Sequence, residues 1–330
     1  MKVLAIADGI ISAAVLKAGL AHTPELTADL TLRTWSHANL ADLQEDNLAV
    51  ELRGPSAIAE PVGVFEGIED YDVLITQFCP IRGEVIRRGS KLKAIGVLRA
   101  GIENVDLDTA NELGVKVVNA PGRNANAVAE FAVGMILAET RNIARAHLGL
   151  RDGKWDRNFP NGDAIPELLG RNIGIVGMGQ IGRRVAELVS AFGAKVSYFD
   201  PYLDTPEFPR YTDLAELAAA VDILTIHSRL TPETKHIVSA DVIAALRPHA
   251  VLVNTARSGL VDEKAMIQAL QERKIMGAAI DTFDDEPLPA DSPFRNLDNV
   301  TITSHLAGST ADAMQRTPSI LAPRVIAALG

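Results

Sequence analysis

Short apolar runs alternate with segments of helical periodicity along almost the whole of this 330-residue chain. Ten of these runs are expected to form buried strands: Val3–Ala7, Val73–Thr76, Lys93–Leu98, Val115–Asn119, Ile173–Val176, Val196–Phe199, Ile223–His227, Val251–Thr255, Gly277–Ile280 and Val300–Thr303. Amphipathic stretches such as Ile181–Phe192 and Glu263–Lys274 lie between many of them. Because strands that are apolar throughout are buried on both faces, the pattern predicts an α/β protein whose parallel sheets are covered by helices on both sides.

Two further segments are predicted to be helical. The stretch from Ala125 to about Leu148 contains no proline, and we expect one long helix there, ending near Gly149 and joining two domains. The segment Ser309–Leu329 also has helical character, although Pro318 and Pro323 should break or kink it. The chain length itself is typical of two domains.

Composition excludes several classes of protein. The chain has 32 Lys and Arg against 42 Asp and Glu, a formal net charge of −10 and only 5% aromatic residues, which argues against nucleic acid as a partner. Its single cysteine, Cys79, rules out a disulfide scaffold. No apolar run approaches the ~18 residues of a spanning helix. Asp8 interrupts the apolar N-terminus where a signal peptide needs a continuous run, so we expect a cytoplasmic protein without membrane contact.

The strongest local motif is a glycine fingerprint between an expected strand and an expected helix. Gly177, Gly179 and Gly182 have the spacing G-x-G-x-x-G, directly after the run Ile173–Val176. The first glycine permits a tight turn, the second lets the backbone approach a pyrophosphate, and the third allows close packing of helix on strand. The helix N-terminus that follows then binds the diphosphate.

An acidic residue completes this dinucleotide signature. Asp200 ends the next expected strand, where a carboxylate accepts hydrogen bonds from the adenine ribose and repels a 2′-phosphate. Pro201 and Tyr202 follow it, with no adjacent arginine. The sequence therefore predicts NAD rather than NADP as the cofactor.

Three polar residues stand at the ends of expected strands or in the loops after them. Arg257 follows Val251–Thr255, Glu286 lies beyond Gly277–Ile280, and His305 comes just after the last run. Each alone also has a structural explanation, as a surface cation, a loop acid or a strand-end histidine. Together they suit hydride transfer to or from a 2-hydroxy acid. A histidine can take the hydroxyl proton, and a carboxylate beside it can orient the ring and raise its pKa. A guanidinium can bind the substrate carboxylate or polarise its carbonyl.

These motifs resemble the D-isomer-specific 2-hydroxyacid dehydrogenase family, in the branch that includes D-3-phosphoglycerate dehydrogenase and hydroxypyruvate or glyoxylate reductases. The resemblance covers about two-thirds of the chain. It rests on six segments: Arg99–Asp106, Asn119–Glu130, the glycine fingerprint, Asn254–Glu263, Asp281–Pro287 and Ser304–Gly308.

The resemblance implies a role for each matching residue. His305 is the implied general acid/base, Glu286 its carboxylate partner and Arg257 the cation that orients the substrate. The implied contacts to NAD are Gly177, Gly179, Gln180, Ile181, Gly182 and Asp200 on the phosphate and adenosine side, with Thr255, Ala256 and Asp281 beside the nicotinamide. The backbone around Arg99, Ala100 and Gly101 is implied to hold the substrate carboxylate, and no metal is expected.

The resemblance also implies the architecture. It predicts two similar doubly wound domains, a Rossmann-type NAD domain over residues 116–307 and a flavodoxin-like substrate domain over 1–115 completed by 308–330, with the active site in the cleft between them. It further implies a homodimer with its interface near the long helix. The predicted reaction is reversible NAD-dependent oxidation of a small anionic D-2-hydroxy acid to its 2-keto acid, with glycerate, phosphoglycerate and sugar acids left open as substrates.

Some positions depart from the family pattern and leave alternatives open. Ser304 stands where proline is usual, Glu103 where aspartate is usual, and Arg229 where proline is common, so Arg229 is either a second cation near the cofactor or a surface residue. Cys79 is expected to be a buried apolar residue, although its place after a strand would also suit a substrate cleft. The rival function is an NAD-sensing corepressor on the same fold, and a formate- or phosphite-type oxidation uses the same arginine and histidine.

Overall fold

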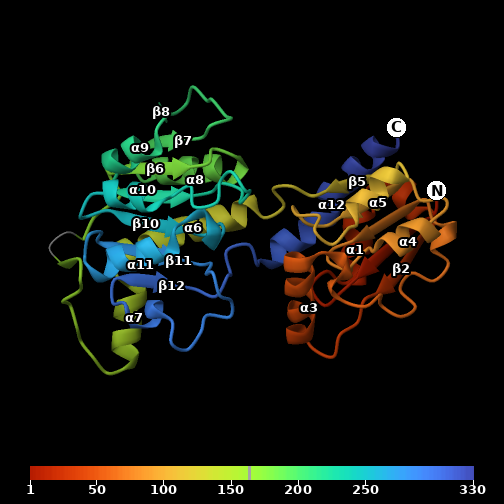
Figure 1. Ribbon diagram of the computed structural model, residues 1–330, viewed down its shortest axis with the longest axis horizontal. Coiled ribbons are helices and arrows are strands. Elements are labelled where there is room, and N and C mark those ends of the chain that lie inside the picture. Colours follow the sequence, from red (N-terminus) through yellow and green to blue (C-terminus); the bar gives the residue numbers. More distant parts are fainter. Residues whose placement is uncertain (163–164) are drawn as a thin grey trace. The chain divides into compact units, whose positions relative to one another are not determined.

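The computed structural model describes residues 1–162 and 165–330 and divides the chain into two compact units. Unit 1 comprises Met1–Asn124 and Thr310–Gly330, and unit 2 comprises Ala125–Ser309. Each unit is built around its own parallel sheet with helices packed against it (Figure 1). The predicted α/β class with two parallel-sheet domains is therefore confirmed.

The sheet of unit 1 has the strand order β2-β1-β3-β4-β5, and all of its strands are parallel. The strands are β1 (Val3–Ala7), β2 (Leu30–Thr34), β3 (Val73–Thr76), β4 (Ala94–Val97) and β5 (Lys116–Asn119). This is the order of flavodoxin-like sheets. Strand β2 was not predicted, because it lies at the sheet edge and its side chains are only partly buried.

The two faces of this sheet are covered by different helices. One face packs against α1 (Ala13–Leu20) and the C-terminal α12 (Ala311–Leu329), and the other against α3 (Leu40–Arg53), α4 (Gly83–Arg88) and α5 (Leu107–Glu112). A short helix, α2 (Pro24–Thr27), follows α1. The C-terminal segment returns to unit 1 because α12 buries apolar side chains, including those of Leu321 and Val325, against β4.

The sheet of unit 2 has the order β12-β11-β10-β9-β6-β7-β8, again with parallel pairing throughout. Its strands are β6 (Asn172–Val176), β7 (Lys195–Phe199), β8 (Arg210–Tyr211), β9 (Ile223–Ile226), β10 (Val251–Asn254), β11 (Gly277–Ile280) and β12 (Val300–Ile302). The chain reverses direction across the sheet between β6 and β9, as in dinucleotide-binding folds, whose ligands bind beyond the carboxyl ends of the strands at that point. Strand β8 is too short to have been predicted from its pattern.

Alternate residues of the unit 2 strands face two helix layers. Ile173 and Ile175 of β6 pack with α6 (Ala125–Thr140) and α8 (Gln180–Ala191). Val176 belongs to the opposite layer, with the helices α9 (Leu214–Ala220), α10 (Ala240–Ala245) and α11 (Glu263–Gln271). The sheet is therefore buried on both faces and rigidly carries the loops that follow its strands.

The expected single helix from Ala125 to Leu148 is wrong. The helix α6 ends at Thr140, and a second helix, α7 (Ile143–Arg151), begins after Asn142, whose φ of 57° is left-handed. Asparagine tolerates this conformation, and the Asn142 amide donates to Asn161 Oδ1 at 2.6 Å.

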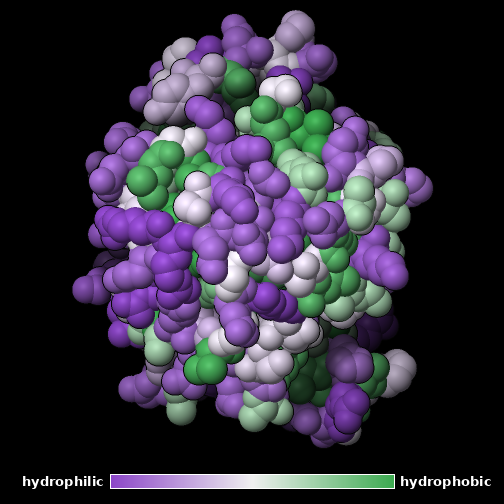
Figure 2. Space-filling view, turned by 90° about the vertical axis from the view of Figure 1, so that its right-hand side faces the viewer, coloured by the Kyte–Doolittle hydropathy of each residue, from purple (hydrophilic) through white to green (hydrophobic). Residues whose placement is uncertain are grey.

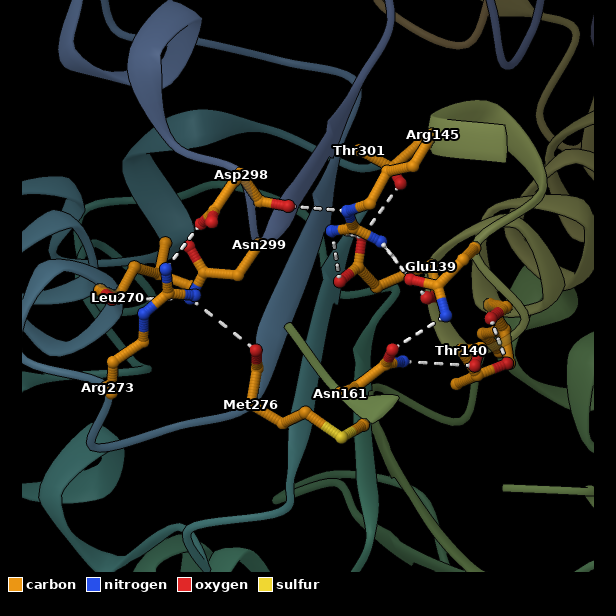
Figure 3. Close-up of polar contacts among 12 residues, drawn as sticks. Glu139, Thr140, Arg145, Asn161, Leu270, Arg273, Met276, Asp298, Asn299 and Thr301 are labelled. Atoms are coloured by element: carbon orange, nitrogen blue, oxygen red, sulfur yellow. Dashed lines mark hydrogen bonds and ion pairs between the residues drawn. The ribbon is translucent and has the colours of Figure 1, made fainter. Parts of the chain in front are cut away.

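A buried ion pair holds the two helices together across this break (Figure 3). The guanidinium of Arg145 in α7 donates from Nη2 to both carboxylate oxygens of Glu139 in α6, each at 2.8 Å. Thr301 of β12 donates to Glu139 Oε2 at 2.7 Å. The pair thus fixes α6, α7 and an edge strand of the sheet to one another.

Two other expectations also differ from the structure. The boundary expected at residue 115 lies at 124, because β5 pairs with β4 in the unit 1 sheet. Pro318 and Pro323 were expected to break or kink the last helix, and they do not break it, since α12 runs through both. Thr317 and Ser319, on either side of Pro318, also donate hydroxyl hydrogen bonds to the helix carbonyl oxygens of Ala313 and Arg316.

The helices of the described residues are all too short or too polar to cross a bilayer. On the face shown in Figure 2, hydrophilic residues cover most of the surface and hydrophobic ones occur in separated groups.

Candidate active site

The glycine fingerprint forms a turn at the carboxyl end of β6, and each glycine meets a different steric demand. Gly177 has φ of 94°, a conformation that side-chain-bearing residues rarely adopt. A Cβ at Gly182 would collide with the carbonyl oxygen of Gly177. A Cβ at Gly179, by contrast, would meet nothing within 4 Å. The turn therefore has open space where a pyrophosphate would approach, so its geometry fits a dinucleotide.

The helix α8 and the strand β7 bring the other adenosine-side candidates to this turn. Gln180 is the first residue of α8 and Ile181 the second, so their N–H groups belong to the helix N-terminus. Asp200 follows β7, and its Oδ2 accepts from Met178 N at 2.8 Å. Its Oδ1 accepts from the N–H groups of Tyr202 and Leu203, both at 2.9 Å. Since a carboxylate has about four acceptor positions, room remains for a ribose hydroxyl.

His305 lies in the loop after β12 and has a left-handed backbone conformation, with φ of 55°. Its N–H donates to the carbonyl oxygen of Asp281 at 2.9 Å. The Asp281 side chain is fully buried and fixes the same loop, because its oxygens accept from Thr303 Oγ1 at 2.5 Å and from the N–H groups of Leu306 and Ala307 at 2.9 Å each. Asp281 thus determines how the His305 loop is held at the end of the sheet.

His305 and Glu286 form a hydrogen-bonded pair. The distance from His305 Nδ1 to Glu286 Oε2 is 2.9 Å, and the other Glu286 oxygen accepts from Phe283 N at 2.9 Å. The hydrogen bond to Glu286 raises the pKa of His305 above its ordinary value, against the opposing effect of burial. Burial acts to raise the pKa of Glu286, but the hydrogen bonds from His305 and Phe283 outweigh it and the pKa is lowered. The arrangement favours an imidazolium beside a carboxylate.

Arg257 is carried by the loop after β10 and is exposed. Its Nη1 donates to Ala256 O at 2.8 Å, and its backbone oxygen accepts from the Asn254 side chain at 2.9 Å. The positive charge of Arg257 lowers the pKa of both Glu286 and His305. For each residue this effect is smaller than that of the hydrogen bond between them. The structure therefore brings together the three residues predicted to carry the chemistry.

Three of the buried polar atoms that have no hydrogen-bond partner among the described residues lie beyond neighbouring strands. They are His227 Nδ1 after β9, Thr255 Oγ1 after β10 and Thr282 Oγ1 after β11. Buried polar groups in proteins are nearly always hydrogen-bonded. Three unpaired polar atoms at the carboxyl ends of neighbouring strands, where ligands of such sheets bind, therefore fit a bound polar group. Thr255 and Ala256 were expected beside a nicotinamide, and their place at the end of β10 suits that expectation.

The candidate carboxylate-binding residues belong to unit 1, after β4. Arg99 is buried, its guanidinium carbon lies 3.3 Å from the centre of the Phe78 ring, and its Nη2 lies 3.3 Å from Glu51. The N–H groups of Ala100 and Gly101 donate to no other group in the described part of the chain. Two successive N–H groups of this kind can bind an anion.

Two residues with open roles are also located. Cys79 is buried, and burial raises the pKa of its thiol well above the ordinary value, which disfavours the reactive thiolate form. Arg229 is exposed in the loop that follows His227. In residues 1–162 and 165–330, no group of three or more His, Cys, Asp or Glu side chains is placed to hold a metal ion.

Sequence reasoning missed Thr282 and Thr303. Thr303 donates to the Asp281 carboxylate, and the buried Thr282 hydroxyl has no hydrogen-bond partner among the described residues. The available signal was their position, because Thr282 is the second residue after β11 and Thr303 directly follows β12. Residues there face the ligand-binding edge of a parallel sheet.

Comparison with known proteins points to one family. Residues 133–307 match the NAD binding domain of the D-isomer specific 2-hydroxyacid dehydrogenases. The chain is 39% identical to a D-3-phosphoglycerate dehydrogenase of Methanocaldococcus jannaschii, over 79% of this chain and 50% of that protein. It thus spans half the length of that relative.

A shorter relative and a solved structure match over nearly their whole length. The chain is 37% identical to a hydroxypyruvate reductase of Thermotoga maritima, over 85% of this chain and 92% of that protein. The crystal structure of a D-isomer specific 2-hydroxyacid dehydrogenase from a Polaromonas species covers 99% of this chain and 96% of its own, with a TM-score of 0.76 and 27% identity.

Proposed function

The chain belongs to the D-isomer-specific 2-hydroxyacid dehydrogenase family, and on that premise we propose that it catalyses reversible, NAD-dependent hydride transfer between a D-2-hydroxy acid and its 2-keto acid. The observation that carries the proposal is the 2.9 Å pair of His305 and Glu286, with Arg257 nearby, at the carboxyl edge of an NAD-binding sheet. When bound, the nicotinamide of NAD supplies the hydride acceptor.

His305 is the proposed general acid/base. Its Nδ1 is engaged by Glu286, so Nε2 is the nitrogen that takes the C2 hydroxyl proton during oxidation. In the reverse direction the imidazolium returns that proton to the carbonyl oxygen. Glu286 keeps the ring oriented and stabilises its charged form, because its carboxylate is itself fixed by the Phe283 N–H.

Arg257 is the proposed substrate-orienting cation. A guanidinium has five N–H donors in a planar fork, and one of them is directed to Ala256 O. The planar fork matches a carboxylate and also polarises a carbonyl oxygen. In unit 1, the N–H groups of Ala100 and Gly101, with the adjoining Arg99 backbone, are proposed to bind a substrate carboxylate.

The proposed NAD contacts follow the order of the strands. Gly177, Gly179, Gln180, Ile181 and Gly182 receive the pyrophosphate, and Asp200 accepts from the adenine ribose. Thr255, Ala256 and Asp281 lie on the nicotinamide side. Asp281 receives three donors already, so about one acceptor position remains for a carboxamide N–H.

The substrate is proposed to be a small anionic acid such as glycerate, phosphoglycerate or a sugar acid. The two relatives described above are named for phosphoglycerate and for hydroxypyruvate, which are acids of this kind. The test is a panel of 2-keto acids, including glyoxylate and hydroxypyruvate, with oxidation of NADH followed at 340 nm. We expect turnover of at least one acid and a loss of about 10²–10⁴-fold in kcat/KM for His305→Ala, with NADH binding retained. Tight NADH binding without turnover on a broad panel would support the corepressor-like sensor instead.

A homodimer is proposed through α7 and the segment after it. No residue of α7 is buried, and Ile143, Leu148 and Leu150 are 56%, 62% and 56% exposed, while Trp155 is 85% exposed. Such a concentration of apolar side chains fits an interface with a second copy. Light scattering should give a dimer mass that Leu148→Glu reduces to the monomer, whereas Leu52→Glu, at a residue of α3 that is 74% exposed, should leave the dimer intact.

A cytoplasmic location is also proposed. It is supported by Cys79, which is the chain's only cysteine and is unpaired and buried. Cell fractionation with antibody detection tests it, and recovery in a secreted fraction would contradict it.

A further inference from the structure

His227 is a histidine that the proposed chemistry does not use, yet it stands at the centre of the candidate site. It directly follows β9, which lies between the fingerprint strand β6 and the Arg257 strand β10. Its N–H donates to Val176 O at 2.8 Å, which ties the residue to the end of β6. The whole residue is only 8% exposed.

One ring nitrogen of His227 is bonded and the other is not. Nε2 lies 2.9 Å from Thr225 Oγ1, whereas Nδ1 is buried and has no hydrogen-bond partner among the described residues. Burial lowers the pKa of His227 to about 3, so the ring is neutral and has one donor and one acceptor nitrogen. The Thr225 hydroxyl can donate to Nε2 or accept from it, so Nδ1 is the N–H nitrogen in one form of the ring and the unprotonated nitrogen in the other. A ligand group that can both donate and accept therefore fits Nδ1 in either form.

The strand order indicates which part of a dinucleotide reaches this position. In the proposed NAD site, Asp200 after β7 accepts from the adenine ribose and the turn after β6, the neighbouring strand, binds the pyrophosphate. The next strand in the same direction is β9, followed by β10 with Thr255. A ligand that crosses the edge in this order places its second ribose beyond β9, and ribose hydroxyls both donate and accept.

We infer that His227 Nδ1 hydrogen-bonds to a hydroxyl of the nicotinamide ribose, making His227 a further cofactor-binding residue that places the nicotinamide half. This assignment rests on the proposed function. It also accounts for the unpaired buried hydroxyls of Thr255 and Thr282, because the nicotinamide half of the cofactor would lie along the ends of β9, β10 and β11.

Matched substitutions separate the two ring nitrogens. The amide of an asparagine reaches the position of Nδ1, and that of a glutamine reaches the position of Nε2. We therefore expect His227→Asn to bind NADH about as tightly as the wild type. His227→Gln and His227→Leu should bind NADH about fivefold more weakly, as for loss of one neutral hydrogen bond.

The probes are NADH, followed by its fluorescence, and ADP, followed by displacement of NADH. ADP carries the adenosine and diphosphate but no second ribose, so its affinity should be the same for all variants. Unchanged NADH affinity in the Gln and Leu variants would overturn the inference, and so would an equal weakening of ADP, which would place the contact on the adenosine half. Thermal melting and circular dichroism check that each variant is folded.

A wild-type measurement makes the test independent of folding of the variants. With ¹⁵N-labelled histidine, the Nδ1 resonance of His227 should shift on addition of NADH and not of ADP, and an unmoved resonance at saturating NADH would refute the contact. If the wild type binds no NADH at all, both the proposed function and the assignment of His227 are contradicted. If the wild type binds NADH and every variant binds alike, only the assignment of His227 fails.

Discussion

The Nδ1 atom of His305 lies 2.9 Å from Glu286 Oε2, although the two residues come from loops after different strands. Each loop is fixed by hydrogen bonds from backbone N–H groups. His305 is held through Asp281, and the Glu286 carboxylate by the Phe283 N–H. The pair is therefore preorganised by backbone contacts, and the histidine needs no rearrangement to present Nε2. This geometry allows one residue to act as a base in oxidation and as an acid in reduction.

Glu286→Gln should change the pH dependence of the reaction. The Glu286 carboxylate raises the pKa of His305, and reduction of the keto acid requires the imidazolium. The kcat/KM for reduction therefore falls as the pH rises through that pKa. Without the negative charge the pKa is lower, so the fall should move to lower pH, while oxidation, which needs the neutral ring, becomes active at lower pH.

The matched control for this prediction is Glu263→Gln. Glu263 accepts from Asp284 N in the same loop region, at 3.0 Å, but does not contact His305. Its pH profiles should follow the wild type. Profiles of Glu286→Gln that coincide with the wild type would show that the pair does not set the protonation of His305.

Gly179→Ala should weaken NADH binding, whereas Gly182→Ala should lower the stability of the fold. A Cβ at Gly179 meets nothing within 4 Å, so this variant should keep the wild-type melting temperature but bind NADH at least about tenfold more weakly, ~1.4 kcal/mol. A Cβ at Gly182 collides with Gly177 O, so that variant should lose about 1–3 kcal/mol of unfolding free energy. Chemical denaturation and NADH titration of both variants measure the contrast, and equal NADH affinity for Gly179→Ala and wild type would contradict the pyrophosphate site.

Asp200→Asn should relax the preference for NADH over NADPH. Two unit charges 4 Å apart repel by about 1 kcal/mol in water, so removal of the carboxylate should narrow the ratio of the two cofactor affinities by about fivefold or more. Asp213→Asn is the control, because that exposed carboxylate caps the N-terminus of α9. Titration with both cofactors tests this, and a wild type that binds NADPH better than NADH would refute the role of Asp200.

Glu139→Gln should destabilise unit 2. Glu139 is 2% exposed, and its loss of charge leaves Arg145 without its bidentate partner (Figure 3). Breaking a buried pair costs about 3–5 kcal/mol, whereas the exposed pair of Arg184 and Glu187 contributes about 0–1 kcal/mol. Denaturant unfolding of Glu139→Gln against Glu187→Gln measures the difference, and equal midpoints would show that the buried pair adds no stability.

Much of the fold could be predicted because it depends on local pattern. The strands β1, β3 and β11 have the bounds that their apolar runs predict. The edge strands β2 and β8 were missed, since one is only half-buried and the other has two residues. An edge strand is defined by its neighbour, and a short or half-polar run contains no sign of that neighbour.

Errors in the helices have a common origin in distant contacts. The break at Asn142 is stabilised by Asn161 and by the pairing of Arg145 with Glu139, residues whose proximity no local pattern indicates. The helix α12 continues through Pro318 because its apolar face is buried in unit 1. Tertiary packing thus overrides local propensity in both places.

The sequence by itself determined the strand and helix alternation and the glycine turn, and it was enough to propose Arg257, Glu286 and His305 as catalytic candidates, because these inferences depend on spacing and residue type. Only the tertiary structure decided that β5 and α12 belong to unit 1, that Asp281 holds the His305 loop, and that His227 has one buried unbonded nitrogen. The physical reason is that hydrogen-bond partners and burial are set by residues far apart in the chain, which meet only when the sheets assemble.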